Sequence, residues 1–147
     1  MTVTPVPKPG VQERILLHLR DYVDHAEKVE VPFALSQMGI ANAVSIARSN
    51  VPRAISGLRD QGYLLEKQAH VTGVSRKRKA YFLTDEGAKL ADDIWSKVGK
   101  QNVRVIGKDG RASTMELAEA LENTDLPLRH VDVIRYLDDS GTIDLSV

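Results

Sequence analysis

Apolar residues near the start of the chain recur at the spacing of an amphipathic helix. Val11, Ile15, Leu19 and Val23 are each four positions apart. They therefore fall along one side of a helix with about 3.6 residues per turn. The pattern predicts a first helix over residues 11–25 that buries a single stripe of side chains.

The segments on either side of this helix have no apolar periodicity. Residues 1–10 alternate prolines with other residues and end on Gly10, a composition that predicts a flexible N-terminal arm. Residues 27–31 are short and mainly polar. They predict a loop or a short strand before Pro32.

Ser36 marks the start of a second helix. Serine is a preferred N-cap because its hydroxyl oxygen accepts a hydrogen bond from a free backbone N–H of the first turn. We expect this helix to run to about residue 44 and residues 45–47 to form a turn. Four of its residues are expected to make apolar contacts: Met38, Ile40, Ala41 and Val44.

A third helix is predicted from about residue 48 to residue 61, where Gly62 ends it. Val51, Ile55 and Leu58 are spaced i, i+4, i+7 and must face the core. The positions left outside carry mainly arginine, serine and asparagine: Arg48, Ser49, Asn50, Pro52, Arg53, Ser56 and Arg59.

Pro52 constrains where this third helix begins. Proline has no backbone N–H, so it is tolerated in the first turn, where that group has no partner within the helix. Ser49 is therefore the expected N-cap. A helix that began at Arg48 would lose one hydrogen bond.

Residues 63–72 and 78–84 alternate between apolar and polar side chains and predict the two strands of a hairpin. Residues 73–75 include a glycine and a serine and form its tip. Four consecutive cations lie beside that tip: Arg76, Lys77, Arg78 and Lys79.

A further helix is expected to start at Thr84 and to carry a broad apolar face. That face consists of Leu90, Ala91, Ile94, Trp95 and Val98. It is wider than one small core requires, so part of it is expected to pack on a second chain or on the C-terminal segment.

The remainder of the chain has a different pattern. Ser113, Thr114, Met115 and Glu116 have the spacing of a capping box, which predicts a helix through about residue 123. Four other elements are expected: a strand at residues 103–106, a turn at 107–110, a helix at 126–137, and a strand at 142–145 that pairs with the first strand.

This order of elements predicts a mainly α protein with a small β component, in the α+β class. Helices, a turn, a further helix and a hairpin are typical of a winged helix-turn-helix DNA-binding domain, here residues 11–99. Residues 101–147 are expected to form a small C-terminal α/β appendage whose role the sequence does not indicate.

Composition narrows the class of protein. With 147 residues, 42% of them hydrophobic, the chain can bury one core or one core and a small satellite. It contains no cysteine, which excludes disulfides, thiolate zinc sites and cysteine nucleophiles. No apolar run approaches about 18 residues, and no signal peptide is evident. We expect a cytoplasmic, nucleoid-associated protein without membrane contacts.

The net charge of zero hides an asymmetry along the chain. Residues 48–80 carry eight lysines and arginines against two acids, whereas residues 111–147 carry three against eight. The basic cluster coincides with the helix and the hairpin that a winged helix directs at DNA. The alternative is that these charges are simply solvated.

The outward residues of the third helix have the chemistry that reads DNA bases. Arginine can bind guanine O6 and N7, asparagine can bind adenine N6 and N7, and serine can bind a base or a phosphate. Because such a helix enters the major groove by its N-terminal part, the candidate DNA-binding residues are Arg48, Ser49, Asn50, Arg53 and Ser56.

The hairpin supplies a second group of candidates. The four cations Arg76 to Lys79 suit a wing that straddles the sugar–phosphate backbone, with Arg76 or Arg78 reaching into the minor groove. His70 lies near the tip and either joins them or is a solvated strand histidine.

Two segments resemble the winged-helix transcriptional regulators of the MarR-like type, especially compact archaeal members. Residues 44–64, VSIARSNVPRAISGLRDQGYL, are similar to the turn, recognition helix and first wing strand of that family. Residues 81–87, YFLTDEG, are similar to the segment that leads from the wing to the last helix. The chain departs from the family pattern at Ala47, where a polar cap is usual, and at Pro52, where a helix former is common.

The resemblance implies a homodimer on a pseudo-palindromic operator in double-stranded DNA. It implies that DNA is contacted by the candidate residues already named, Arg48, Ser49, Asn50, Arg53 and Ser56 of the third helix and Arg76 to Lys79 of the wing. The function expected from the sequence is therefore a sequence-specific DNA-binding transcriptional regulator.

The sequence predicts neither an enzyme nor a bound cofactor or metal ion. Its four histidines, His18, His25, His70 and His130, are scattered, and no glycine-rich phosphate loop or metal-ligand spacing is present. His18 and His25 are seven positions apart, and such pairs are usually surface residues.

A second interpretation remains open for the same fold. The winged helix could serve protein or RNA contacts within a larger assembly, and the acidic C-terminal segment could dock a protein partner. That segment could equally be a small folded extension that stiffens a dimer.

Overall fold

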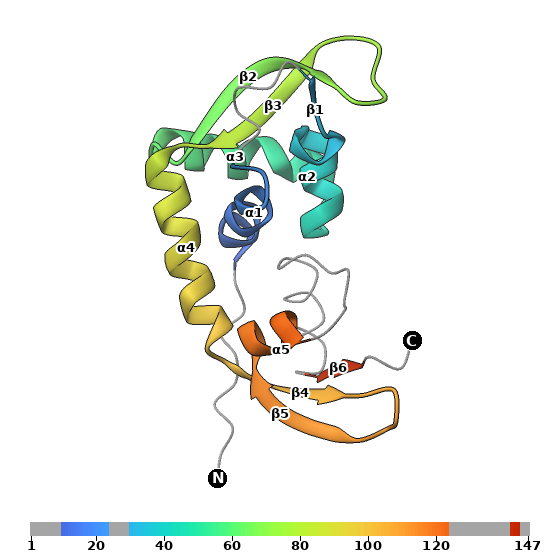
Figure 1. Cartoon of the computed structure of the whole chain (residues 1–147). Helices are drawn as coiled ribbons and strands as arrows, with labels where there is room; N and C mark the ends of the chain where they lie inside the picture. Colours follow the sequence, from blue (N-terminus) through green and yellow to red (C-terminus); the bar gives the residue numbers. More distant parts are fainter. Residues whose placement is uncertain (1–9, 24–29, 124–141, 145–147) are drawn as a thin grey trace.

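The computed structural model describes residues 10–23, 30–123 and 142–144 and has the predicted α+β composition (Figure 1). The N-terminal part runs, with η for a 3₁₀ turn, in the order α1 (Val11–Arg20), β1 (Glu30–Val31), η2 (Phe33–Leu35), α2 (Gln37–Val44), η3 (Arg48–Asn50), α3 (Val51–Asp60), β2 (Leu64–Val71), β3 (Arg78–Leu83) and α4 (Asp85–Gly99). The C-terminal part consists of β4 (Asn102–Ile106), β5 (Ala112–Glu116), α5 (Leu117–Asn123) and β6 (Thr142–Asp144).

The strands β1, β2 and β3 form a three-stranded sheet in that order. β1 pairs parallel with β2, and β2 and β3 are the antiparallel strands of the predicted hairpin. Three helices, with a short strand after the first and a hairpin after the third, make a winged helix. The predicted fold class is confirmed.

Helix α1 differs from its prediction in length and in the way it is buried. It ends at Arg20, whereas the apolar spacing had predicted a helix to residue 25. Val11 and Val23, the ends of the expected stripe, are exposed, and the five consecutive residues 15–19 are buried. The single stripe was wrong because α1 is the central helix, which α2, α3, α4 and β3 contact from several sides.

His18 lies within this buried stretch and is not a surface residue. It is 0% exposed, and its Nε2 lies 2.8 Å from the carbonyl oxygen of Ala34. Its ring also packs edge-on against Tyr22. A histidine is tolerated at this depth because a backbone carbonyl satisfies its ring nitrogen.

Ser36 is the N-cap of α2, as predicted. Its Oγ accepts a hydrogen bond from the Gly39 amide at 3.1 Å and donates one to the Phe33 carbonyl at 2.6 Å. The backbone of Ser36 also bridges to Ala80 in β3. The start of α2 is therefore fixed to the wing as well as to η2.

The predicted turn after α2 is confirmed at Ser45, which has a positive φ of 58°. The recognition helix then begins differently from the expectation. Ser49 makes no capping hydrogen bond; residues 48–50 form the 3₁₀ turn η3, which has Ala47 at its N-cap position. The Val51 amide donates a hydrogen bond to the Arg48 carbonyl. That carbonyl therefore has a partner although Pro52, four residues further on, has no N–H to donate. This explains how helical structure begins at Arg48 without the predicted loss.

The inner and outer faces of α3 are as predicted. Val51, Ile55 and Leu58 are at most 2% exposed, and burying each of them contributes about 1.5–3 kcal/mol. Gly62 ends the helix with a φ of 82°, a left-handed conformation that glycine adopts without strain. The amide of Tyr63 then bonds back to the Leu58 carbonyl.

Helix α4 is 15 residues long, and Thr84 is its N-cap, whose side chain accepts a hydrogen bond from the Gly87 amide. An ion pair of 2.8 Å joins Arg20 of α1 to Asp92 of α4. The far end of α4 packs on α5, where Gly99 approaches Ala118. The second of the two expected partners, the C-terminal segment, therefore covers part of the broad apolar face. No helix among the described residues is both long and apolar enough to cross a membrane.

The C-terminal segment corrects one prediction. Residues 112–116 are the strand β5, paired antiparallel with β4, and not the capping box of a helix. The two strands pair from Ile106 opposite Ala112 to Asn102 opposite Glu116, and these backbone hydrogen bonds outweigh the local capping pattern. Helix α5 therefore begins only at Leu117. The strand predicted near residue 142 is confirmed as β6, parallel to β4. The predicted helix at 126–137 and residues 1–9 of the predicted arm lie outside the described residues.

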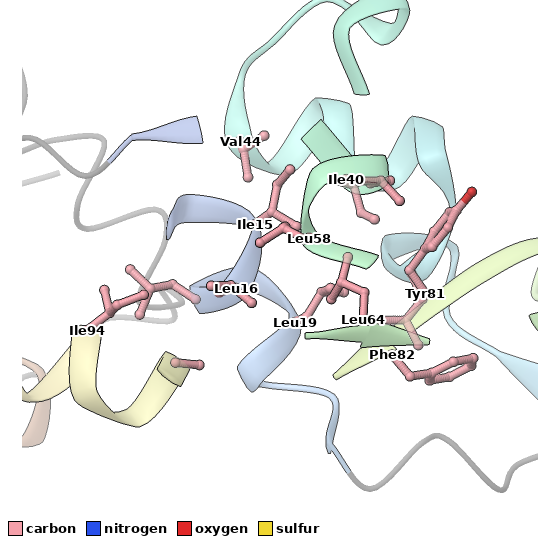
Figure 2. Close-up of a cluster of buried hydrophobic side chains, with 14 of the residues drawn as sticks. Ile15, Leu16, Leu19, Ile40, Val44, Leu58, Leu64, Tyr81, Phe82 and Ile94 are labelled. Atoms are coloured by element: carbon pink, nitrogen blue, oxygen red, sulfur yellow. The ribbon is translucent and has the colours of Figure 1, made fainter. Parts of the chain in front are cut away.

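The core is one connected cluster centred on α1. Figure 2 shows Ile15, Leu16 and Leu19 of α1 among side chains from α2, α3, the wing strands and α4. Met38, expected in this core, is 41% exposed instead. The cluster continues through Val98 of α4 to Val103 and Leu117, so the C-terminal segment is joined to the winged helix by apolar contacts.

Gly39 provides a test of how tightly η2 packs on α2. A Cβ at this position would lie 2.0 Å from the Phe33 carbonyl oxygen. Because a backbone atom cannot move aside, we expect Gly39→Ala to lower the free energy of unfolding by about 3 kcal/mol. Urea denaturation followed by circular dichroism measures this change.

Gly57→Ala is the matched control in α3. Its Cβ would meet only the end of the flexible Gln12 side chain, and alanine favours a helix interior by about 0.5–1 kcal/mol. We expect stability within about 1 kcal/mol of the parent. Equal losses in the two variants would contradict the close approach at Gly39.

Candidate nucleic-acid interface

A groove of about 610 Å³ lies between the wing and the start of the helix-turn-helix. One wall comes from η2, the first turn of α2 and the start of η3, and the other comes from the wing. In Figure 1 the wing, which is the hairpin of β2 and β3, lies at the top of the view, above α2 and α3. The lining residues are Phe33, Ser36, Gln37, Met38 and Arg48 on the first wall, and Gln68, Val74, Lys77, Arg78 and Lys79 on the second.

The groove brings together predicted site residues from two separate elements. Arg48 of η3 lines it together with Lys77, Arg78 and Lys79 of the wing. All four side chains are exposed, and among the described residues that line the groove none is acidic. The surface between the two elements is therefore cationic.

The other predicted residues lie outside the groove but on the molecular surface. Ser49 and Asn50 of η3, Arg53 and Ser56 of α3, and Arg76 in the wing loop are all exposed. Positions 49, 53 and 56 are spaced i, i+4, i+7, opposite the buried side of the helix. The recognition helix thus presents its predicted polar face to solvent.

Six groove residues were not among the sequence candidates for DNA binding: Phe33, Ser36, Gln37, Met38, Gln68 and Val74. Phe33 and Met38 are 38% and 41% exposed, although apolar residues around a helix start are usually buried. Gln68 could have been found from the hairpin register, because it lies directly opposite Lys79. No local pattern indicated that Phe33 would face solvent.

A chain of polar contacts fixes the base of the wing to both helices of the motif. The Nε2 of Gln37 in α2 donates to the Tyr81 hydroxyl at 3.0 Å, and that hydroxyl donates to Glu66 at 2.9 Å. Arg59 of α3 lies 3.5 Å from the same carboxylate. One tyrosine therefore connects α2, both wing strands and, through Glu66, α3.

The ionisation of Tyr81 follows from this position. Burial, the largest cause, raises the pKa of Tyr81 above its ordinary value of 10.0, and the Glu66 carboxylate adds to the increase while the Gln37 amide opposes it. The hydroxyl therefore remains protonated at neutral pH. It can then accept from Gln37 and donate to Glu66 at the same time.

His70 is not part of the groove. It lies on β2 opposite Glu30 of β1, and both line a separate shallow depression of about 540 Å³ together with residues of the wing loop. Its side chain is exposed. Of the two interpretations left open by the sequence, the structure places His70 as an exposed strand histidine apart from the wing cations.

The described residues contain no cluster of side chains that could bind a metal ion. No three histidine, aspartate or glutamate side chains lie close enough there to hold an ion. The chemistry available at the surface is instead that of cations, amides and hydroxyls. These groups bind anionic oxygens and the polar edges of bases.

Solved structures with a related arrangement are transcription regulators. The chain is similar to MepR, a transcription regulator of the Staphylococcus aureus multidrug efflux pump MepA, with 22% identity over 59% of this chain and 55% of that one and a TM-score of 0.43. It is also similar to a variant of Lactococcus lactis ZitR, with 18% identity over 66% and 57% of the two chains and a TM-score of 0.45. MepR and ZitR are winged-helix regulators of the MarR family.

A third similar structure is an S. aureus MepR–DNA complex, with 22% identity, 58% and 52% coverage, and a TM-score of 0.41. No family model and no curated protein matches the chain. The chain spans little more than half the length of these solved chains. At these scores the winged-helix assignment rests on the element order and strand pairing of the chain itself.

Tyr81→Phe tests the polar chain at the base of the wing. Loss of the hydroxyl removes two hydrogen bonds, so we expect the free energy of unfolding at pH 7 to fall by about 1–2 kcal/mol. Because the pKa of Tyr81 is higher in the folded than in the unfolded chain, its contribution is complete below about pH 10 and is lost as the pH rises through the folded-state value.

Urea denaturation of both proteins at pH 7 and pH 11 measures this effect. We expect the gap between wild type and Tyr81→Phe to narrow at the higher pH. Tyr63→Phe, which removes a hydroxyl outside the polar chain, is the control. A gap that stays constant with pH would contradict the assigned role of the Tyr81 proton.

Proposed function

We propose that this protein is a sequence-specific, double-stranded DNA-binding transcriptional regulator. The helical segment 48–60 enters the major groove, and the wing loop and its flanking cations contact the backbone or the minor groove. The observation that carries the proposal is the position of Arg48 in one groove with Lys77, Arg78 and Lys79.

The placement of these cations suits two adjoining features of a duplex. A helix fits the major groove, and a basic hairpin fits the backbone or minor groove next to it. Both must approach from the same side of the protein. A groove lined by cations from η3 and from the wing, together with an outward polar face on α3, supports that approach.

The residues divide into two roles within the proposal. Arg53 and Asn50, on the outward side of the recognition segment, are suited to hydrogen-bond base edges, which differ between base pairs in the major groove. Lys77 and Lys79 are suited to phosphates, which are alike in every sequence. The first group would set sequence preference and the second would set general affinity.

The resemblance to MarR-like regulators adds the wider context of the proposal. The protein would act in the cytoplasm as a homodimer on a pseudo-palindromic site, because two copies related by a two-fold axis read two half-sites. Sedimentation of the free protein and the symmetry of selected DNA sites both address this point.

Selection of bound duplexes from a random pool tests the proposal directly. We expect recovery of one preferred site and an affinity that falls with salt, with a slope of about −0.9 for each phosphate neutralised. Binding without a salt slope would favour the alternative of a protein-docking module. A preference for RNA over duplex DNA would favour the RNA alternative.

Two alanine substitutions separate base reading from phosphate binding. We expect Arg53→Ala to weaken the preferred site by about 1–3 kcal/mol and to relax the preference at one or two base pairs. Lys77→Ala should weaken preferred and random duplexes alike and reduce the salt slope by about one phosphate.

Fluorescence anisotropy with both duplexes at several salt concentrations measures these effects. Lys97→Ala, which removes an exposed cation from α4, is the matched control and should leave both affinities unchanged. Equal losses on preferred and random duplex for Arg53→Ala would contradict its role in base reading.

A further inference from the structure

The apolar residues in the cationic groove call for an occupant that is both anionic and apolar. Phe33 and Met38 are two of the five large hydrophobic side chains that are exposed among the described residues, and both line this groove. A surface that bound phosphates alone would need only the cations. The combination indicates a ligand in which charged groups alternate with carbon-rich ones.

The position of the groove identifies that ligand. In a duplex, one sugar–phosphate strand separates the major groove from the adjoining minor groove. If the recognition segment and the wing occupy those two grooves, the surface between them must cover this strand. The groove lies between them, since Arg48 begins the recognition segment and Lys77 belongs to the wing loop.

We propose that Phe33 and Met38 pack against deoxyribose carbons of this strand and make the groove selective for deoxyribose over ribose. The inference rests on the proposed DNA-binding function and deepens it. The cations would bind the phosphates on either side of the sugar. Ribose carries a 2′-hydroxyl, which would lose its hydrogen bonds to water against an apolar wall.

The two apolar residues are held in place before any ligand binds. The Phe33 carbonyl accepts hydrogen bonds from both the amide and the hydroxyl of Ser36, at 3.0 and 2.6 Å. Met38 lies in the first turn of α2, between Gln37, which is bonded to Tyr81, and Gly39, whose amide is bonded to Ser36. A wall with a fixed backbone can discriminate a single added hydroxyl without first being ordered.

Single-nucleotide substitution in the selected duplex tests the inference with the full-length protein. Each position of both strands is replaced in turn by its ribonucleotide, and affinity is measured by anisotropy. A 2′-fluoro nucleotide at the same positions controls for sugar pucker. We expect one or two positions where the 2′-hydroxyl weakens binding about tenfold, equivalent to about 1.4 kcal/mol, and where 2′-fluoro has little effect.

The variants Phe33→Ala and Met38→Ala connect this loss to the groove. Both side chains are exposed, so the fold should be retained, and thermal unfolding confirms that it is. We expect discrimination at those positions to fall below about twofold, because the apolar wall is gone. Leu65→Ala removes an exposed hydrophobic residue of β2 that does not line the groove and should keep the full discrimination.

Two results would overturn the inference while leaving the proposed function intact. One is salt-dependent binding of the selected site with no position sensitive to the 2′-hydroxyl. The other is discrimination that survives both alanine variants. Absence of any duplex binding would instead remove the proposed function, and the selectivity inferred here with it.

Discussion

The seating of β3 between β2 and the start of α2 is the constraint on which the candidate interface depends. Ala80 is fully buried and bridges to Ser36, so the wing strand is held on both edges. The start of α2 in turn packs closely on η2 because Gly39 has no side chain to meet the Phe33 carbonyl. The wing is thereby fixed beside the helix-turn-helix, and its cations share a groove with Arg48.

Electrostatics at the base of the wing support the same arrangement. Glu66 lies on the same face of β2 as Gln68 of the groove, two positions further from the tip. Its carboxylate accepts a hydrogen bond from the Tyr81 hydroxyl and pairs with Arg59. It therefore offsets less of the positive charge of the groove. The polar chain thus joins the wing to α2 and α3 while the groove keeps its positive character.

The sequence predicted the elements whose pattern is local and failed where distant contacts decide. The Ser36 cap, the helix start near Thr84, the buried side of α3 and the hairpin follow from short-range spacing and are confirmed. Residues 113–116 became a strand because pairing with β4 outweighs a capping pattern. The nine candidate residues are all exposed, but only the tertiary packing of η2 on α2 turns Phe33 and Met38 toward the cations, so sequence periodicity could not identify them.

Site-directed cleavage of DNA tests most directly whether helix and wing act from one side of the molecule. The chain has no cysteine, so Ser49→Cys and Ser75→Cys each carry a single iron chelate, with Ser96→Cys on α4 as control. We expect cleavage from residues 49 and 75 within about five base pairs of each other, half a helical turn, and none from residue 96. Cleavage from only one of the first two positions, or from sites more than a full turn apart, would contradict it.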